Sequence, residues 1–209
     1  MSTYEALSVT TDPERASSGA GRPPSRARMP RIERRAQILE TATSTFARAG
    51  YAGTSLEEIA REAGVSRVIL YRHFESKADL YRAVLDRAYE RLAATVPGPE
   101  FSDASVDGLV SAAAEDPDGF RLLFQHAARE PEFREEMDKF RAEMVTLAHR
   151  QLARIIRSRA WSRWAAELAT TVAIEAVLAW LEAGQPDPAR TPDRVRQAIR
   201  GVIEAAGRA

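Results

Sequence analysis

The stretch that decides the fold is TSLEEIAREAGVSRVILYRHFESK, residues 54–77. Thr54, followed three residues later by Glu57, has the pattern of a capping box, so a helix is predicted to begin near Ser55. Apolar side chains then recur at helical spacing, at Leu56, Ile59, Ala60 and Ala63. Gly64 gives the backbone the freedom to turn sharply, so the helix is predicted to end there.

A second helix is predicted directly after this turn. Ser66 is placed to cap it, and Leu70 and Phe74 point inward at positions i and i+4. The side chains expected to point mainly elsewhere are Arg67, Ile69, Tyr71 and His73. Small residues at Ala60 and Gly64 suit a close, nearly perpendicular crossing of the two helices. This arrangement is typical of a helix-turn-helix, whose second helix enters the major groove of DNA.

Short motifs in and around this stretch resemble those of the TetR family of bacterial transcriptional regulators. The matching motifs are Ile59-Ala60, AGVS at 63–66, LYRHF at 70–74, Ser76-Lys77, and Phe46, Gly50 and Tyr51 in the preceding helix. The likeness covers about residues 31–92, under half of the chain. It implies an all-α fold of about nine helices, with an N-terminal three-helix domain that carries the helix-turn-helix. A larger helical domain for ligand binding and dimerisation is expected to follow.

The composition excludes several classes of protein. Of the 209 residues 44% are apolar, enough for a packed core, and 29% are charged. No apolar run approaches the roughly 18 residues that cross a bilayer, and the N-terminus lacks the apolar centre of a signal peptide. A cytoplasmic location without a membrane partner is therefore expected. The chain has no cysteine, and its three histidines lie far apart in the sequence, so neither a metal site nor a cofactor is expected.

The net charge is zero, but the positive charge is concentrated near the predicted DNA-reading helix. Six arginines and one glutamate lie between Arg22 and Arg35, and residues 67–74 contain two arginines and no acidic residue. This distribution favours a nucleic-acid partner. Residues 1–29 lack any apolar period and are expected to form a flexible basic arm. Two interpretations of the arm stay open, an inert tail or a segment whose arginines reach DNA.

Three segments of the chain are thus predicted. After the arm, residues 30–75 form the DNA-binding domain, with the TetR-type region at about 32–92 and the reading motif at 55–74. Residues 76–209 form the ligand-sensing and dimerisation domain. The predicted helices, apart from those of the motif, span residues 30–50, 76–92, 103–115, 117–129, 131–159 and 161–183, with a last one after a loop at 184–192.

Two of these helices carry especially regular apolar stripes. In the first helix the predicted buried stripe is Ile32, Leu39, Ala42, Phe46 and Ala49. In the helix predicted for residues 131–159 it is Phe133, Met137, Phe140, Met144, Leu147, Leu152 and Ile155. The helix predicted for residues 161–183 is apolar around more of its circumference than the core of one domain requires, which indicates a partner helix.

The resemblance implies binding to a palindromic double-stranded DNA operator. Arg67 is expected to bond a guanine edge, Ile69 to contact a thymine methyl group and Tyr71 to touch sugar or phosphate. The other expected contacts are to backbone phosphates. The full predicted set is Thr54, Ser55, Ser66, Arg67, Ile69, Tyr71, His73 and Lys77.

The resemblance also implies a homodimeric repressor that a small, largely apolar ligand releases from DNA. The candidate pocket residues are Leu92, Leu109, Phe120, Leu123, Phe124, Phe140, Met144, Leu147, Trp164 and Leu168. The candidate dimer residues are Val172, Val177, Trp180, Leu181, Val195 and Ile199. Residues 116–133 are similar to the matching part of TetR-type regulators that sense acyl-CoA in fatty-acid synthesis, which makes an acyl-CoA-like effector one candidate.

No catalytic residues are predicted. The neighbouring carboxylates Glu57 and Glu58 lie in a first helical turn, where they are favourably placed against the helix dipole. Two alternatives remain open on the sequence alone. One is an all-helical enzyme or small-molecule-binding protein whose DNA-binding domain is not functional. The other is an interaction module that uses the surface of residues 161–181 to bind a different protein.

Overall fold

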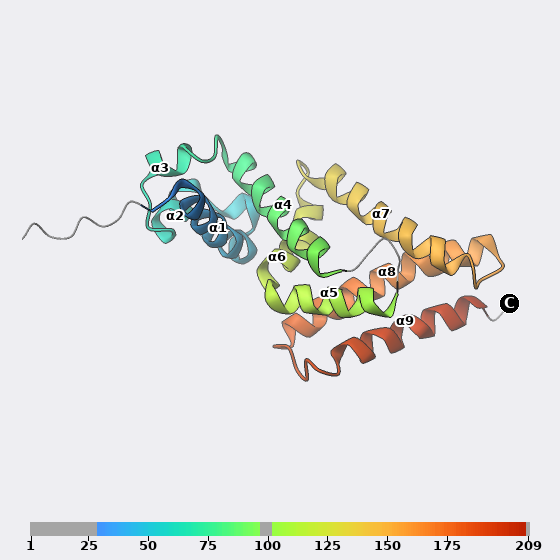
Figure 1. Cartoon of the computed structure of the whole chain (residues 1–209). Coiled ribbons are helices and arrows are strands. Elements are labelled where there is room, and N and C mark those ends of the chain that lie inside the picture. Colours follow the sequence, from blue (N-terminus) through green and yellow to red (C-terminus); the bar gives the residue numbers. More distant parts are fainter. Residues whose placement is uncertain (1–28, 97–101, 208–209) are drawn as a thin grey trace, which may run out of the picture.

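The computed structural model describes residues 29–96 and 102–207, and every regular element in these two segments is helical (Figure 1). The predicted all-α class is confirmed. The helices of the described segments are α1 Arg31–Gly53, α2 Leu56–Glu62, α3 Arg67–Tyr71, α4 Lys77–Thr95, α5 Asp103–Glu115, α6 Pro117–Arg121, α7 Arg134–Leu152, α8 Arg159–Glu182 and α9 Thr191–Gly207. A π-helical turn, Leu122–His126, and a 3-10 turn, Ala127–Arg129, follow α6. The predicted basic arm lies outside the described residues, apart from Met29.

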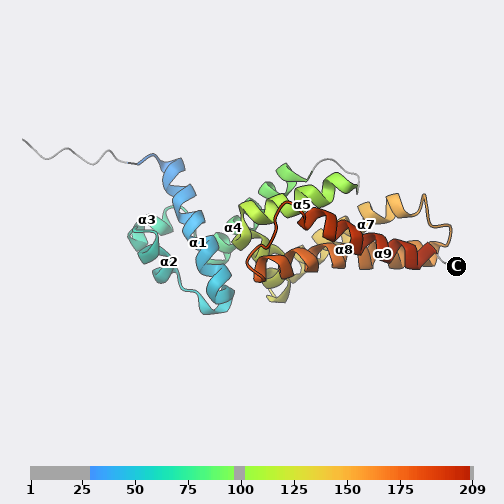
Figure 2. The same cartoon turned by 90° about the horizontal axis from the view of Figure 1, so that it is seen from below.

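The molecule is elongated, with the helix-turn-helix at one end (Figure 1). Helices α1, α2 and α3 form this end, which we call the head, and α4 runs from the head towards the remaining helices. Seen from below, α8 and α9 lie side by side and form one broad face of the larger part (Figure 2).

The core of the head forms largely as the stripe of α1 predicts. Leu39, Ala42 and Phe46 are buried, together with Ile38, which the predicted stripe omitted. The prediction was wrong for Ile32, which is 83% exposed, and for Ala49, which is also exposed. Both lie near an end of α1. Helical period gives the direction of a side chain around the axis, but not how far along the axis the partner helices reach.

The turn from α1 into α2 uses different caps from those predicted. Ser55, not Thr54, caps α2, since its hydroxyl accepts a hydrogen bond from the Glu58 amide at 3.1 Å. Thr54 is buried, and its hydroxyl donates to the carbonyl of Gly50 at 2.8 Å. The predicted capping box of Thr54 and Glu57 was therefore wrong, because the chain needs Thr54 to close the end of α1.

The turn between α2 and α3 has the geometry that its glycine predicts. Gly64 has a φ of +64°, in the left-handed region that glycine adopts without steric cost. A Cβ atom at this position would meet nothing within 4 Å, so the glycine serves the turn rather than a close approach of helices. The small residue at the crossing is Ala60, which is 3% exposed.

A serine caps each of the helices α3 and α4, and the cap at Ser66 is the one predicted. Ser66 accepts from the Ile69 amide at 3.3 Å, and Ser76 accepts from the Asp79 amide at 3.0 Å. Each hydroxyl satisfies a backbone amide that has no partner within its own helix.

In the larger part, two helices of the structure differ from those predicted from the sequence. The helix predicted for residues 131–159 is α7 only, from Arg134 to Leu152, and a turn separates it from α8. Ile155 lies in this turn and is 65% exposed, so its place in the predicted stripe was wrong. Ser158 begins the new helix α8, since its hydroxyl accepts a hydrogen bond from the Trp161 amide at 3.4 Å. The helix predicted for residues 117–129 is helical throughout, but changes from α to π to 3-10 geometry.

An aromatic cluster packs the head against the start of α7. Tyr81 of α4 lies 4.8 Å from Phe46 and 4.7 Å from Phe133, measured between ring centroids. The ring of Tyr51, in α1, contacts those of Tyr81 and Phe133, with centroid distances of 4.9 and 5.3 Å. Tyr51 also donates a hydrogen bond to the Glu132 carboxylate at 3.1 Å. The head is therefore held to the larger part by aromatic contacts of α1 and α4 with Phe133 and by the hydrogen bond of Tyr51 to Glu132.

Candidate nucleic-acid interface and cavity

Helix α3 presents one exposed edge beyond the body of the head. Its inward residue Leu70 and the following Phe74 are 0% and 1% exposed, so the orientation of the helix is fixed by the core. The opposite edge carries Arg67, Val68 and Tyr71, all exposed, with Val68 at 65%. A short helix with a basic, aromatic and aliphatic edge matches the size and chemistry of a DNA major groove.

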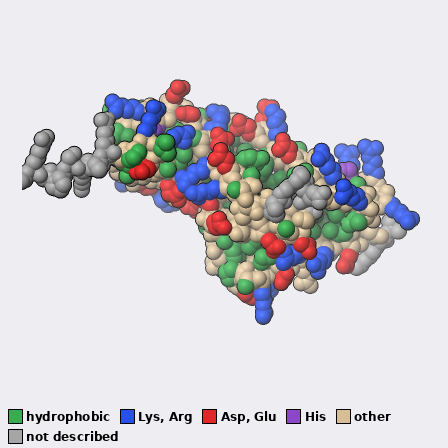
Figure 3. Space-filling model, in the orientation of Figure 1, with side chains coloured by type: hydrophobic (Ala, Val, Ile, Leu, Met, Phe, Trp, Pro, Cys, Tyr) green, Lys and Arg blue, Asp and Glu red, His purple; other side chains and the backbone are tan. Residues whose placement is uncertain are grey.

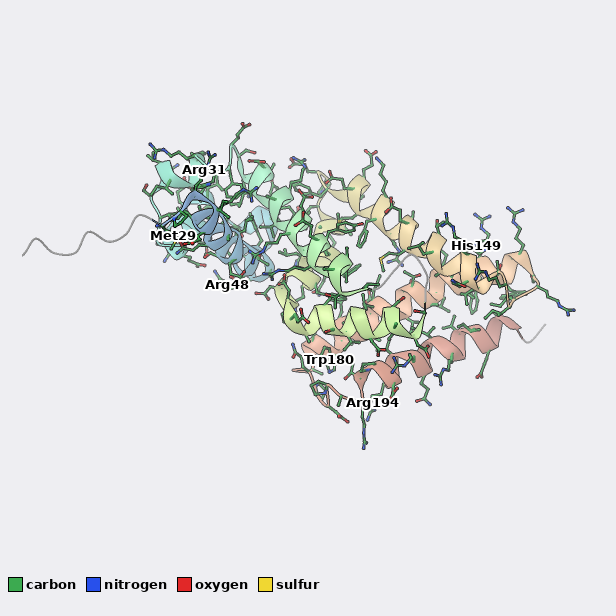
Figure 4. The ribbon with its side chains drawn as sticks, in the orientation of Figure 1. Met29, Arg31, Arg48, His149, Trp180 and Arg194 are labelled. Carbon is green, nitrogen blue, oxygen red and sulfur yellow. The ribbon has the colours of Figure 1, made fainter. Side chains whose placement is uncertain are left out.

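A basic concavity of about 620 Å³ lies beside this edge, between α3 and the start of α1. It is lined by Met29, Pro30, Arg31, Arg34, Ile69, Arg72 and His73. Figure 4 shows Met29 and Arg31 together at this end of the molecule, and Lys and Arg side chains gather over it in Figure 3. Within the part of the chain that the structure describes, Arg31, Arg34 and Arg72 form no ion pair with a carboxylate. Their charge is therefore available to an anion.

His73 lies in the wall of this concavity. Its Nδ1 atom is buried and has no hydrogen-bond partner among the described residues. The pKa of His73 is lowered, first by burial and then by the positive charges of Arg31, Arg35 and Arg34. The neutral ring is thus favoured while the concavity holds no anion.

The remaining predicted DNA-binding residues differ in their surroundings. Arg67 is exposed and forms an ion pair with Glu57 of α2. Ile69 is half-buried, on the side of α3 that faces the concavity. Ser55 and Ser66 are exposed helix caps, whereas Thr54 is buried in the turn after α1.

Lys77 makes its contacts inside the protein. Its ammonium donates to the carbonyl of Thr54 at 2.9 Å and lies 4.4 Å from the centroid of the Tyr51 ring. These contacts tie the start of α4 to the turn after α1. The structure therefore gives Lys77 a role in positioning the head.

A second concave region, which we call the cavity, lies between α4, α5, α7 and α8. Its volume is about 400 Å³, within the range of small-molecule sites. The structure brings five predicted pocket residues together there, namely Leu92, Leu109, Phe140, Met144 and Leu147. The lining residues that the sequence did not single out are Tyr89, Ala93, Val96, Ser105, Val106, Thr170 and Ala173. Their separation over three helices explains why no local pattern could have found them.

The other predicted pocket residues lie elsewhere. Phe120 and Leu123 are buried in the main core, and Phe124 packs on the Phe120 ring with 4.6 Å between centroids. Trp164 is 41% exposed and Leu168 half-buried, both outside the cavity lining on α8.

The predicted dimer residues are mostly part of the chain's own core. Val177, Trp180, Leu181, Val195 and Ile199 are each at most 7% exposed, and Val172 is half-buried. They hold α8 and α9 together within one chain, and the Trp180 indole also donates to the Pro186 carbonyl at 2.9 Å. Figure 4 places Trp180 and Arg194 at the end where α8 turns into α9. The exposed residues of these helices include Trp161, Ala179, Ala198, Gly201 and Ala205.

Other kinds of site find little support in the described segments. No group of three or more His, Cys, Asp or Glu side chains that could hold a metal ion occurs there. Helix α8 is long and apolar enough to cross a membrane, but 56% of its most apolar window is buried inside the molecule. This is the behaviour of a core helix.

Comparisons with known proteins agree with the geometry of the head. The family described as bacterial regulatory proteins, tetR family, matches residues 38–84. The HTH-type transcriptional activator FasR of Mycolicibacterium smegmatis is 37% identical over 107 residues, which cover 47% of this chain and 49% of that protein. The HTH-type transcriptional repressor SCO4008 of Streptomyces coelicolor is 35% identical over 91 residues, covering 43% of this chain and 47% of that protein. The chain thus spans about half the length of these curated relatives.

Solved structures match over more of the chain, at lower identity. A TetR-like transcriptional regulator from Rhodococcus sp. RHA1 superposes with a TM-score of 0.71 and 21% identity, covering 84% of this chain and 98% of that one. A transcriptional regulator from Aquifex aeolicus VF5 gives a TM-score of 0.65 and 16% identity, over 81% and 99% of the two chains. These likenesses show that the fold extends through the larger helical part. Residues 38–84 thus carry a helix-turn-helix of the tetR family type, and the chain as a whole shares the fold of TetR-like regulators.

Proposed function

We propose that the protein is a cytoplasmic, homodimeric repressor that binds a palindromic DNA operator and leaves it when a small apolar effector enters the cavity. The observation that carries the proposal is the exposed edge of α3, which projects Arg67, Val68 and Tyr71 beside the basic concavity. One curated relative is named an activator and another a repressor. That this protein represses rather than activates transcription is therefore part of the proposal.

We assign the DNA contacts by the exposure of each side chain. Arg67 contacts a base edge, and Val68 is better exposed than Ile69 to meet a thymine methyl group. Tyr71 reaches sugar or phosphate. Backbone phosphates occupy the basic concavity, where the guanidinium groups of Arg31, Arg34 and Arg72 form no ion pair with a carboxylate of the described residues.

Two predicted DNA contacts receive a different role. Thr54 is buried, and the ammonium of Lys77 is bonded to the Thr54 carbonyl. A phosphate contact would require Lys77 to leave both this carbonyl and the Tyr51 ring. We therefore assign the pair to the stability of the head, which positions α3.

The dimer is proposed to form on the outer face of α8 and α9. Ala198, Gly201 and Ala205 lie exposed at positions i, i+3 and i+7 of α9, so they share one face of the helix. Small side chains there let a second copy approach closely, and Ala179 and Trp161 extend the face over α8. Two heads could then contact half-sites about 34–36 Å apart, one turn of DNA.

Signalling from the cavity to the head is proposed to pass through α4. Leu92 and Tyr89 of α4 line the cavity, and residues of the same helix hold the head. Arg87 forms an ion pair with Glu40 of α1, while Arg91 contacts Asp116 at 2.9 Å. A shift of α4 would therefore move α1 and change the distance between the two reading helices. A coupling of about 1–3 kcal/mol is enough to alter DNA occupancy strongly.

The function is tested by footprinting the full chain on the DNA upstream of its own gene, and by measuring its mass in solution. Protection of a palindrome by a dimer is the expected result. Gly201→Arg places a charge on the outer face of α9 and is expected to give monomers that bind the palindrome much more weakly. Gly201→Ala keeps the face small and is expected to remain dimeric. A dimeric Gly201→Arg protein would contradict the proposed interface, and the absence of any protected site would favour a small-molecule-binding protein.

DNA affinity is expected to rise as the pH falls from about 7.5 to 6. In the free protein burial and three arginines lower the pKa of His73, which favours the neutral ring. A phosphate in the concavity favours the charged ring and raises this pKa, so DNA binding takes up a proton. The affinity should rise at most about tenfold per pH unit, because one group is involved.

Fluorescence anisotropy with a labelled operator at several pH values measures this effect. His73→Gln is expected to remove the pH dependence. His126→Gln is the matched control, because the pKa of His126 is also lowered by burial but this residue lies in the π-helical turn after α6. A pH dependence that survives in His73→Gln would place the proton uptake elsewhere.

A further inference from the structure

The mostly apolar lining of the cavity includes one side chain whose polar atom is buried without a hydrogen-bond partner among the described residues. Most of the lining is aliphatic or aromatic, and among the described residues no Lys, Arg, Asp, Glu or His belongs to it. The polar side chains among the lining residues are Tyr89, Ser105 and Thr170. Thr170 is 2% exposed, and its hydroxyl is buried without a hydrogen-bond partner in the described segments.

The hydroxyl of Thr170 differs from those of comparable threonines in the same protein. A threonine inside a helix commonly donates to the carbonyl four residues earlier. Such bonds of 2.8 Å are made by Thr43, Thr45, Thr146 and Thr171. Thr170 precedes Thr171 on α8, yet it makes no such bond. An unpaired buried hydroxyl costs free energy, so a group at this position suits a partner that enters from outside.

We propose that Thr170 is the polar recognition residue of the effector site, and that the effector is a neutral amphiphile. This inference rests on the proposed function, in which the cavity holds the effector. The hydrocarbon part of the ligand packs against Leu109, Phe140 and Met144. One uncharged group, such as a hydroxyl or an ester carbonyl, hydrogen-bonds to the Thr170 hydroxyl.

The lining also defines what the cavity rejects. A carboxylate, phosphate or ammonium placed inside would lose its hydration without meeting an opposite charge. Any charged portion of an effector must therefore stay outside the cavity. An ionised fatty acid is for this reason a poorer ligand than the alcohol of the same chain length.

Calorimetric titration of the full chain with 1-decanol, decanoate and decylammonium at pH 8 tests the proposal. We expect 1-decanol to bind at least about tenfold more tightly than either ion. Thr170→Val keeps nearly the same shape but removes the hydroxyl, and is expected to weaken 1-decanol binding about five- to tenfold. Thr170→Ser is expected to keep most of the affinity.

The thermal midpoint of the ligand-free protein gives a second readout. Thr170→Val should lower the affinity for 1-decanol but raise this midpoint. Thr170→Val removes an unsatisfied buried group and is expected to raise the midpoint. The matched control is Thr171→Val, whose hydroxyl donates to the Glu167 carbonyl and accepts from Arg141 at 2.6 Å. This control should lower the midpoint and leave 1-decanol binding unchanged. If Thr170→Val does not fold, Thr170→Ala provides the same binding comparison.

The proposal is overturned if Thr170→Val binds 1-decanol as tightly as the unchanged protein, if the ions bind equally well, or if none of the three probes binds. Operator binding without any probe is measured separately for the same proteins. A chain that binds 1-decanol through Thr170 but protects no DNA would refute the proposed function and leave the ligand site standing. A chain that binds its operator normally but binds none of the three probes would refute the ligand site and leave the proposed DNA-binding function standing.

Discussion

Replacement of Arg67 by alanine is expected to weaken operator binding about 5- to 150-fold, the equivalent of about 1–3 kcal/mol. Arg67 is the exposed guanidinium of α3 and is the side chain best suited to bond a guanine edge. Its ion pair with Glu57 joins two exposed side chains and opposes DNA binding only weakly. Anisotropy titrations against the operator and its single-base variants should show relaxed preference at one base pair of each half-site.

Arg34→Ala is the matched control for this result. Arg34 lines the basic concavity and is proposed to contact phosphate, so its loss should weaken binding to all DNA sequences alike. The slope of log affinity against log salt should fall by about one. If Arg67→Ala and Arg34→Ala gave the same salt dependence and the same loss on every sequence, the division into base and phosphate contacts would be wrong.

Phe133→Ala is expected to lower the free energy of unfolding by about 3–5 kcal/mol. The Phe133 ring is fully buried, contacts Tyr51 and Tyr81, and has the Arg82 guanidinium over it at 5.3 Å. Its removal leaves a cavity where the head meets the start of α7. The change is measured by urea denaturation, with the midpoint and slope fitted together.

Phe133→Leu is the companion variant. It keeps most of the volume and should cost less than about 1.5 kcal/mol, although it loses the aromatic contacts. A small loss for Phe133→Ala would mean that the head and the larger part are joined less firmly than the aromatic cluster indicates. DNA binding by the folded fraction then reports whether this contact also sets the position of the head.

The head could be predicted from the sequence because its signals are local. A turn glycine, two serine caps and an i, i+4 apolar pair lie within residues 54–77, and the structure has them at Gly64, Ser66, Ser76, Leu70 and Phe74. Each acts on backbone groups or neighbours within one or two turns. The misplaced cap at Thr54 shows the limit, because a tertiary turn needed that hydroxyl to close α1.

Residues of the larger part were assigned less well, since their role depends on which helix lies opposite. Val177 and Ile199 look like surplus apolar surface in the sequence, but α8 and α9 bury them against each other. Phe120 and Phe140 have the same residue type, and only Phe140 lines the cavity. Composition and period cannot distinguish such residues.

The sequence by itself determined the helical class, the helix-turn-helix and the orientation of α3, because capping and helical period are properties of neighbouring residues. The tertiary structure alone decided that Arg31, Arg34, Arg72 and His73 share one concavity. It also decided that Thr170, whose hydroxyl has no partner among the described residues, belongs to the lining of the cavity. These groups come from separate helices. Their spacing is set by the packing of side chains between helices, which no short stretch of the chain encodes.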